Sequence, residues 1–296
     1  MRSFFRFPGG KSKLSKRIAR IIFDRCGAIS DYREPFFGGG SVGLEVMEHL
    51  GPGAKVWIND KDDALMSIWQ AVVENPHSIT DPTMGYEPRL KDFYEFKYRL
   101  MDHDDKSSPQ DRAIMHLVMR QISRSGLGVM SGGPMGGRSQ KSKDCKINAR
   151  WSPNAMSKKI MQAHKLFSKF QVKFTSLDYA DVLKGVTEDS VVYLDPPYRQ
   201  KGHQLYQVQF SKEEHIKLAG MLKKLDCKWF LPYDNCQEVR ELYDWAEIIQ
   251  IPVSYTLNNT GRAVELLIMP RLEGDGSSSQ PDMTSRAIVR NSGGRT

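Results

Sequence analysis

The chain has 296 residues, 40% of them hydrophobic and 26% charged, which is the composition of an ordinary soluble globular protein. It contains no apolar run near the roughly 18 residues of a membrane span, and its basic, aromatic N-terminal segment lacks the apolar core of a signal peptide. The formal net charge of +8 is compatible with a polyanionic partner, although a basic surface alone would also account for it.

Helical and extended patterns alternate over the first 75 residues. Apolar residues at helical spacing predict helices at 11–24, 41–50 and 63–75, and short β-rich runs predict strands at 32–37 and 54–60. Strands that alternate with helices are typical of a parallel sheet with helices on both faces. We therefore expect an α/β domain of three layers.

This alternation is interrupted between residues 76 and 155. Helical patterns at 86–102 and 109–123 are followed by a glycine-rich loop. From Arg120 to Arg150 the sequence has seven basic residues, one acidic residue and no aromatic residue, so we expect a basic surface loop with little core. After this loop another helix is expected at 152–170. Residues 76–155 are therefore predicted to be a helical inserted subdomain.

Strand and helix patterns alternate again from residue 171 to residue 270. The last two predicted strands, 247–255 and 263–270, are separated by a short polar segment, which favours an antiparallel hairpin at the sheet edge. Residues 1–75 and 156–272 are thus expected to form one α/β domain. Residues 273–296 are rich in glycine and serine and are expected to be a disordered tail.

The cysteines, Cys26, Cys145, Cys227 and Cys236, show neither a C-x-x-C pair nor zinc-type spacing with histidine. They are expected to be reduced thiols, as in a cytoplasmic protein. No H-E-x-x-H or G-x-S-x-G motif occurs, and the acidic run at 102–105 is expected to be solvated. No metal site is predicted.

Three consecutive glycines, 38–40, follow the predicted strand 32–37 and precede a helix. Glycine permits close approach of a ligand to the backbone and tight packing of helix on strand. Asp60 ends the next predicted strand, where nucleotide-binding α/β folds have a carboxylate for the ribose hydroxyls. These features predict an adenosine-containing cofactor without distinguishing NAD from others, so an NAD-dependent oxidoreductase stays an alternative at this point.

A second carboxylate, Asp195, ends the buried run 191–194 and is followed by Pro196, Pro197 and Tyr198. The Asp195 carboxylate and the Pro196 carbonyl can accept the two hydrogens of an amine, and the prolines restrict the backbone so that both acceptors are held in place. This arrangement suits an exocyclic nucleobase amine, whose nitrogen would then attack a sulfonium methyl group. Tyr198 offers a face for stacking the base, which must first be flipped out of a duplex.

Several motifs in this order make the sequence similar to the Dam-type, or D12 class, DNA adenine-N6 methyltransferases. They are FPGGK at 7–11, EPFFGGGSV at 34–42, NDKD at 59–62 and DPPY at 195–198, within a similarity over about residues 4–270. The resemblance implies a Rossmann-like AdoMet-dependent methyltransferase sheet, mostly parallel with a C-terminal antiparallel hairpin, plus a helical inserted DNA-recognition subdomain. It also implies S-adenosylmethionine as cofactor and double-stranded DNA as substrate.

The resemblance further implies roles for individual residues. The catalytic residues would be Asp195, Pro196 and Tyr198. The cofactor-binding residues would be Phe7, Lys11, Glu34, Phe36, Gly38, Gly40, Ser41, Asp60, Asp178 and Asp195. The DNA-binding residues would be Arg124, Arg138, Lys141 and Lys143. Without the resemblance, Phe7 would fit a core aromatic, Lys11 a solvated lysine and Asp178 a helix cap.

The expected activity is site-specific transfer of a methyl group from S-adenosylmethionine to adenine N6 in duplex DNA. Cytosine-N4 methylation uses the same amine chemistry and stays an alternative, although its enzymes usually have serine in place of Asp195. Cytosine-C5 methylation needs a Pro-Cys nucleophile, which this chain lacks. A DNA-binding protein on a decayed methyltransferase fold is disfavoured because the motif residues are retained. The stretch 123–137 departs from the family pattern, which leaves the recognised DNA sequence open. A cognate restriction nuclease encoded elsewhere is a possible partner.

Overall fold

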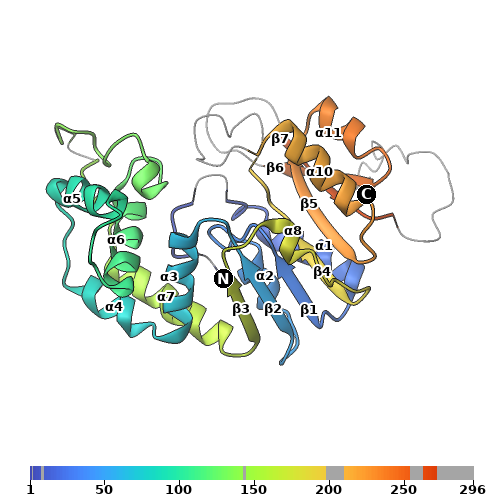
Figure 1. The fold of residues 1–296 in the computed structure, drawn as a ribbon, viewed down its shortest axis with the longest axis horizontal. Coiled ribbons are helices and arrows are strands. Elements are labelled where there is room, and N and C mark those ends of the chain that lie inside the picture. Colours follow the sequence, from blue (N-terminus) through green and yellow to red (C-terminus); the bar gives the residue numbers. More distant parts are fainter. Residues whose placement is uncertain (2, 8–9, 143–144, 198–209, 254–262, 272–296) are drawn as a thin grey trace, which may run out of the picture.

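A seven-stranded sheet forms the centre of the molecule (Figure 1). The structure is a computed structural model that describes residues 1, 3–7, 10–142, 145–197, 210–253 and 263–271. The strands lie in the order β3-β2-β1-β4-β5-β7-β6. Their bounds are β1 Asp31–Glu34, β2 Lys55–Asn59, β3 Gln171–Thr175, β4 Ser190–Tyr193, β5 Lys228–Asp234, β6 Glu247–Val253 and β7 Ala263–Met269.

The direction in which the sheet grows reverses beside β1. Strand β1 pairs in parallel with β2 on one side and with β4 on the other, and parallel pairing continues outward to β3 and to β5. Such a switch point leaves a crevice at the carboxyl ends of the two central strands, and open α/β sheets bind ligands there. The ends of β1 and β4 carry the two predicted motifs with Glu34 and Asp195.

The C-terminal end of the sheet is antiparallel. Strand β7 pairs antiparallel with both β5 and β6, which makes β6 the edge strand. This confirms the prediction of a mostly parallel α/β sheet with a C-terminal antiparallel hairpin. Strand β1 is shorter than the predicted strand 32–37, because Pro35 has no backbone N–H for the ladder.

Helices cover both faces of the sheet (Figure 1). Alternate residues of β4 point to opposite faces, so Val191 and Tyr193 join one buried cluster and Val192 and Leu194 join the other. The first cluster packs under α1 Ser15–Cys26, α2 Gly43–Met47, α3 Asp63–Glu74 and α7 Pro153–Phe167. The second packs under α8 Tyr179–Val182, α10 Lys212–Leu222 and α11 Gln237–Leu242. Within the described ranges, no helix has both the length and the apolar character needed to cross a membrane.

The chain between α3 and α7 forms a helical region beside the sheet (Figure 1). It comprises α4 His77–Met84, α5 Leu90–Met101, α6 Pro109–Ile122 and the short 3-10 helix η1 Gly128–Met130. The region has its own buried cluster, in which Phe93 and Ile147 take part, and α6 also adds Leu117 to the main core. Burial of Met135 and Ile147 corrects the expectation that the basic loop has little core. The boundaries of the inserted subdomain, residues 76 and 155, stay a prediction.

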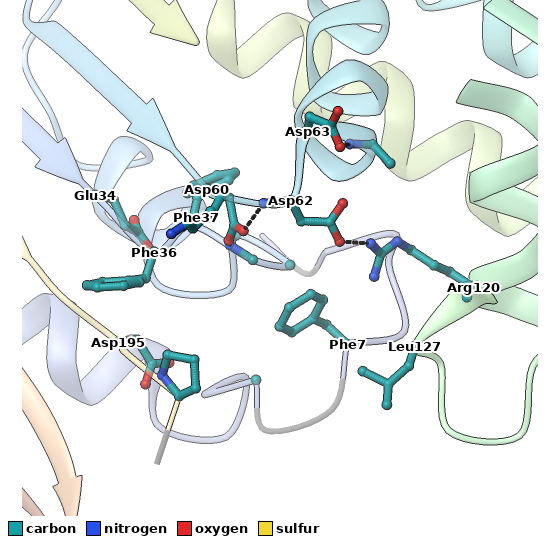
Figure 2. Close-up of a pocket in the computed structure, with 18 of the residues that line it drawn as sticks. Phe7, Glu34, Phe36, Phe37, Asp60, Asp62, Asp63, Arg120, Leu127 and Asp195 are labelled. Carbon is teal, nitrogen blue, oxygen red and sulfur yellow. Dashed lines mark hydrogen bonds and ion pairs between the residues drawn. The ribbon is translucent and has the colours of Figure 1, made fainter. Parts of the chain in front are cut away.

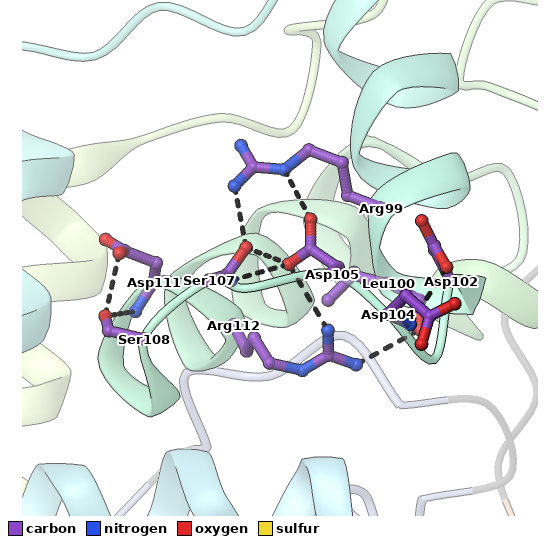
Figure 3. Close-up of polar contacts among 9 residues, drawn as sticks. All are labelled: Arg99, Leu100, Asp102, Asp104, Asp105, Ser107, Ser108, Asp111 and Arg112. Atoms are coloured by element: carbon purple, nitrogen blue, oxygen red, sulfur yellow. Dashed lines mark hydrogen bonds and ion pairs between the residues drawn. The ribbon is translucent and has the colours of Figure 1, made fainter.

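Ion pairs hold the connection between α5 and α6 (Figure 3). Asp105 lies between two arginines: Arg99 Nε donates to its Oδ2 at 3.1 Å, and Arg112 Nη1 lies 3.6 Å from its Oδ1. Hydrogen bonds from Ser107, followed by the interactions with Arg99, lower the pKa of Asp105 to about 2. The acidic run expected to be solvated therefore includes one carboxylate that braces the connection.

Candidate active site

A cavity of about 1290 Å³ opens at the carboxyl ends of the central strands (Figure 2). Its walls come from the ends of β1, β2 and β4, from the segment before α1, and from α6 with the loop that follows it. The cavity brings together these predicted site residues: Phe7, Lys11, Glu34, Phe36, Gly38, Gly40, Ser41, Asp60, Asp178, Asp195 and Pro196. The predicted residues Tyr198 and Lys143 lie outside the described residues.

The glycine turn packs against an aromatic ring of the N-terminal segment. A Cβ atom at Gly38, whose φ is +50°, would lie 2.9 Å from Phe7 Cε1, and one at Gly39 would lie 2.8 Å from Phe7 Cβ. A side chain at Gly40, with φ +69°, would meet the Phe37 ring at 2.6 Å. Glycine is therefore needed here to admit Phe7 and Phe37, in addition to any ligand that approaches the turn.

Asp60 ties the end of β2 to this turn. Gly38 N donates to Asp60 Oδ2 at 2.7 Å, and Asp62 N donates to Asp60 Oδ1 at 3.0 Å. Burial raises the pKa of Asp60 to about 6, with the nearby Asp62 carboxylate adding to the effect and the backbone hydrogen bonds opposing it. The carboxylate predicted to bind a ribose thus also fixes the glycine turn.

Glu34 ends β1 and lines the cavity. The Tyr32 hydroxyl donates to Glu34 Oε2 at 2.7 Å, and both side chains are buried. Burial raises the pKa of Glu34 well above its ordinary value, and the carboxylates of Asp195 and Asp60 raise it further, against the hydrogen bond from Tyr32. Glu34 therefore keeps its proton to a higher pH than a solvent-exposed glutamate does.

Asp195 follows β4 and is paired with a lysine from the segment before α1. Lys11 Nζ lies 3.2 Å from Asp195 Oδ1 and 3.7 Å from Glu265 Oε2 on β7. Lys11 is buried, which excludes the alternative that it is a solvated lysine. Sequence reasoning missed Glu265, although a carboxylate in the apolar strand AVELLIM was a signal that pointed to it.

Arg120 closes the side of the cavity that faces α6. Its guanidinium forms an ion pair with Asp62 and lies 5.9 Å from the centre of the Phe7 ring (Figure 2). Asp62 also caps α3 by accepting a hydrogen bond from Leu65 N at 2.9 Å. Arg120, counted from sequence among the basic residues of the surface loop, is in fact buried and paired. It therefore joins the helical region to the sheet beside the predicted cofactor residues.

Aromatic side chains form the wall of the cavity beyond Phe36. The rings of Phe36 and Tyr179 are stacked with centroids 5.5 Å apart, and Phe210 lies edge-on to Phe36 at 5.8 Å. Asp178 caps α8 by accepting a hydrogen bond from Ala180 N at 3.0 Å, as the alternative interpretation of this residue expected, and it also lines the cavity. This wall offers apolar surface to a planar ring.

The described basic residues of the loop after α6 lie outside this cavity. Arg124, Arg138 and Lys141 are exposed, and the two arginines border a separate hollow of about 370 Å³. An antiparallel bridge between Ser123 and Pro134 holds the loop, with Arg124 N donating to Gly133 O at 2.9 Å. The same loop lines the large cavity with residues 127–130, so it connects the basic surface to the site.

Comparison with known proteins shows which family the chain resembles. The family model of the D12 class N6 adenine-specific DNA methyltransferases matches residues 7–257. A relative, the Type II methyltransferase M.MjaIII of Methanocaldococcus jannaschii, is 25% identical over 246 residues, which cover 76% of this chain and 81% of the relative. The X-ray structure of precorrin 8w decarboxylase from Methanobacterium thermoautotrophicum covers 92% of this chain and 100% of its own at 10% identity, with a TM-score of 0.42. The family match runs from the FPGGK motif past the DPPY motif, and the chain therefore belongs to the D12 class of N6 adenine-specific DNA methyltransferases.

Proposed function

We propose that this protein transfers the methyl group of S-adenosylmethionine to the N6 amine of an adenine flipped out of double-stranded DNA, at a specific sequence. One observation carries the proposal. Asp195, Pro196, the glycine turn and Asp60 all line one cavity, which lies at the switch point of the sheet. The similarity to a Type II methyltransferase favours a role beside a restriction nuclease encoded elsewhere.

The residues around the cavity fit S-adenosylmethionine. Asp60 would accept hydrogen bonds from the ribose, the Phe36 and Tyr179 rings would border the adenine, and the glycine turn would lie against the methionine end. The buried hydroxyl of Tyr193 has no hydrogen-bond partner among the described residues and supplies a further polar atom beside Asp195. When bound, the cofactor supplies a methyl group activated on a sulfonium.

Asp195 and Pro196 would act on the amine of the target base. The Asp195 carboxylate and the Pro196 carbonyl each accept one amine hydrogen, which frees the nitrogen lone pair from the ring and stabilises the positive charge that develops on nitrogen. The carboxylate is also positioned to hold the proton that the methylated amine loses. Proline fixes the backbone, so both acceptors are oriented before the base arrives.

The proposed function is tested by incubating the purified protein with unmodified duplex DNA and radiolabelled S-adenosylmethionine. We expect label in the DNA, N6-methyladenine on mass spectrometry of the nucleosides, and modification at one short sequence. N4-methylcytosine would instead identify the alternative target. Absence of methylation together with binding of nicotinamide cofactor would refute the proposal in favour of an oxidoreductase.

Binding of S-adenosylmethionine should weaken at acid pH through Asp60. Its pKa of about 6 in the free protein means that the carboxylate is charged above that pH and protonated below it, and protonation removes an acceptor for the ribose. We expect the affinity to fall by at most about tenfold per pH unit below this pKa. Calorimetric titration from about pH 7.5 to about pH 5 measures this.

The Asp60→Asn variant is the control for that pH dependence. Glu34 lies in the same cavity and its pKa is also raised, so it is the main competing explanation for a pH effect. Asp60→Asn should bind S-adenosylmethionine weakly, with a flat profile over this range. If Asp60→Asn keeps the wild-type pH dependence, a titrating group other than Asp60 causes the change in affinity.

Neutralising Arg124, Arg138 and Lys141 together should weaken binding to duplex DNA and flatten its salt dependence. Each phosphate contact contributes about 0.9 to the slope of log affinity against log salt, so the slope should fall by about 2–3. Fluorescence anisotropy at several salt concentrations measures both quantities. The matched control neutralises Lys55, Lys165 and Lys169, which are exposed at or before the amino ends of β2 and β3. If the two variants show the same slope of log affinity against log salt, the loop does not contact the DNA phosphates.

A further inference from the structure

A buried lysine joins the C-terminal hairpin to the catalytic turn. Lys11 Nζ lies between two carboxylates, 3.2 Å from Asp195 Oδ1 and 3.7 Å from Glu265 Oε2. The three residues come from the segment before α1, from the end of β4 and from β7, so the contact is possible only in the folded sheet. The side chains of Lys11 and Glu265 are 5% and 11% exposed, which removes most of the solvent that would screen their charges.

Glu265 is an unfavourable residue for its strand. It interrupts a β7 segment that is otherwise apolar, and residues from Leu266 to Met269 are buried in the two main core clusters. Its partner in the register of β5 is Asp234, and like charges directly opposite one another destabilise a sheet. A buried carboxylate also costs free energy unless it is paired. Residues that break the apolar pattern of a buried strand in this way are frequently functional.

We propose that Glu265 is a positioning residue that acts on Asp195 through Lys11. Glu265 anchors the ammonium group from the side of β7, so that Lys11 holds one carboxylate oxygen of Asp195 and sets the orientation of that carboxylate. The inference rests on the proposed function, in which Asp195 must receive the amine of the target base. It gives the C-terminal hairpin a part in catalysis that none of the sequence motifs indicated.

Because Lys11 is paired with both Glu265 and Asp195, its positive charge neutralises the Asp195 carboxylate only in part. An ammonium bound to Asp195 alone would neutralise the acceptor that the amine requires, whereas an ammonium divided between two carboxylates leaves Asp195 the stronger acceptor. Removal of the Glu265 charge should therefore impair the chemical step more than the binding of DNA or cofactor. Misplacement of a catalytic group by about 1 Å can lower the rate by about 100-fold.

The test is the Glu265→Gln variant in the full-length protein, with methyl transfer to DNA as the assay. We expect kcat to fall by about 10- to 100-fold, with KM for DNA and the Kd of S-adenosylmethionine changed by less than about threefold. The melting temperature should stay close to that of the wild type, because Lys11 keeps its ion pair with Asp195 and the repulsion between Glu265 and Asp234 is relieved. Glu265→Asp, which keeps the charge, should recover part of the lost kcat.

Two further variants separate this role from a structural one. Glu247→Gln removes a charge from the same hairpin and breaks an ion pair with Arg25, but Glu247 lies outside the cavity and this variant should keep wild-type kcat. In a Lys11→Met background, Glu265→Gln should cause no further loss. If the wild type is active and Glu265→Gln has the same kcat, the inference is wrong. It is also wrong if Glu265→Gln loses activity only in proportion to the fraction of protein that is unfolded. An inactive wild type would instead refute the proposed function.

Discussion

Replacing Asp195 with alanine or asparagine should lower the rate of methyl transfer by about 1000-fold or more, on the scale of losses from removing a general base or a charge-stabilising group. The variant loses the acceptor that holds the amine and stabilises the charge developing on nitrogen. Lys11 keeps its contact with Glu265, so the buried ammonium is not left unpaired and the fold should persist. Single-turnover assays with radiolabelled S-adenosylmethionine measure the rate, and circular dichroism measures the fold.

Asp31→Asn is the matched control for the asparagine variant. The side chains of Asp31 and Asp195 are 20% and 22% exposed, and each forms an ion pair close to the end of a central strand. Asp31, however, begins β1 and so lies at the opposite end of the sheet from the cavity. Its substitution should leave methyl transfer within about twofold of the wild type, because Asp31 pairs with Arg33 and Ser190 away from the cavity. Equal losses in the two variants would show that Asp195 has no special role.

Replacing Gly43 with alanine should destabilise the protein by about 2 kcal/mol, as overpacking of a core commonly does. The added Cβ would lie 2.2 Å from Glu34 Oε2 and 2.6 Å from Phe37 Cε2. Both neighbours are buried, and Glu34 is held by Tyr32, so neither can move away without disturbing the floor of the cavity. Chemical denaturation measures the change in free energy of unfolding, and calorimetry should show weaker binding of S-adenosylmethionine.

Gly220→Ala tests whether this loss comes from the contact. Gly220 lies within α10 and has no atom within 4 Å of the position that a Cβ would occupy. Alanine inside a helix is favoured over glycine by about 0.8–1 kcal/mol, so this variant should be as stable as the wild type or more so. If Gly43→Ala also stabilised the protein, the close packing of Glu34 against α2 would be wrong.

Much of the fold could be predicted because its signals are local. Helix α6 begins at Pro109 after a serine cap and α3 begins after Asp62, and both boundaries were predicted from residues next to them. The end of β1 before Pro35 was not, because the prediction extended that strand to residue 37. Helix α4 was not predicted, because Pro82 lies inside it and its apolar residues are few. The short separation of β6 and β7 in the sequence likewise indicated their antiparallel pairing.

The candidate site was predicted less completely. Asp60 and Asp195 stand directly after strands, and the parallel sheet necessarily brings such strand ends to one edge. The sequence did not indicate that Phe7 packs on the glycine turn, that Arg120 is buried against Asp62, or that Glu265 shares Lys11 with Asp195. These contacts join segments that are far apart in the chain, and Phe7 and Arg120 alone resemble ordinary core and surface residues.

By itself, the sequence determined the alternation of strands and helices, the glycine turn, and the acidic residues at the strand ends, because hydrophobic periodicity and backbone restriction act over a few neighbouring residues. Only the tertiary structure decided which charges are buried together and which residues pair across the cavity. Those outcomes depend on the distances between strands β1, β4 and β7 and on the loss of solvent between them, which no short stretch of sequence specifies.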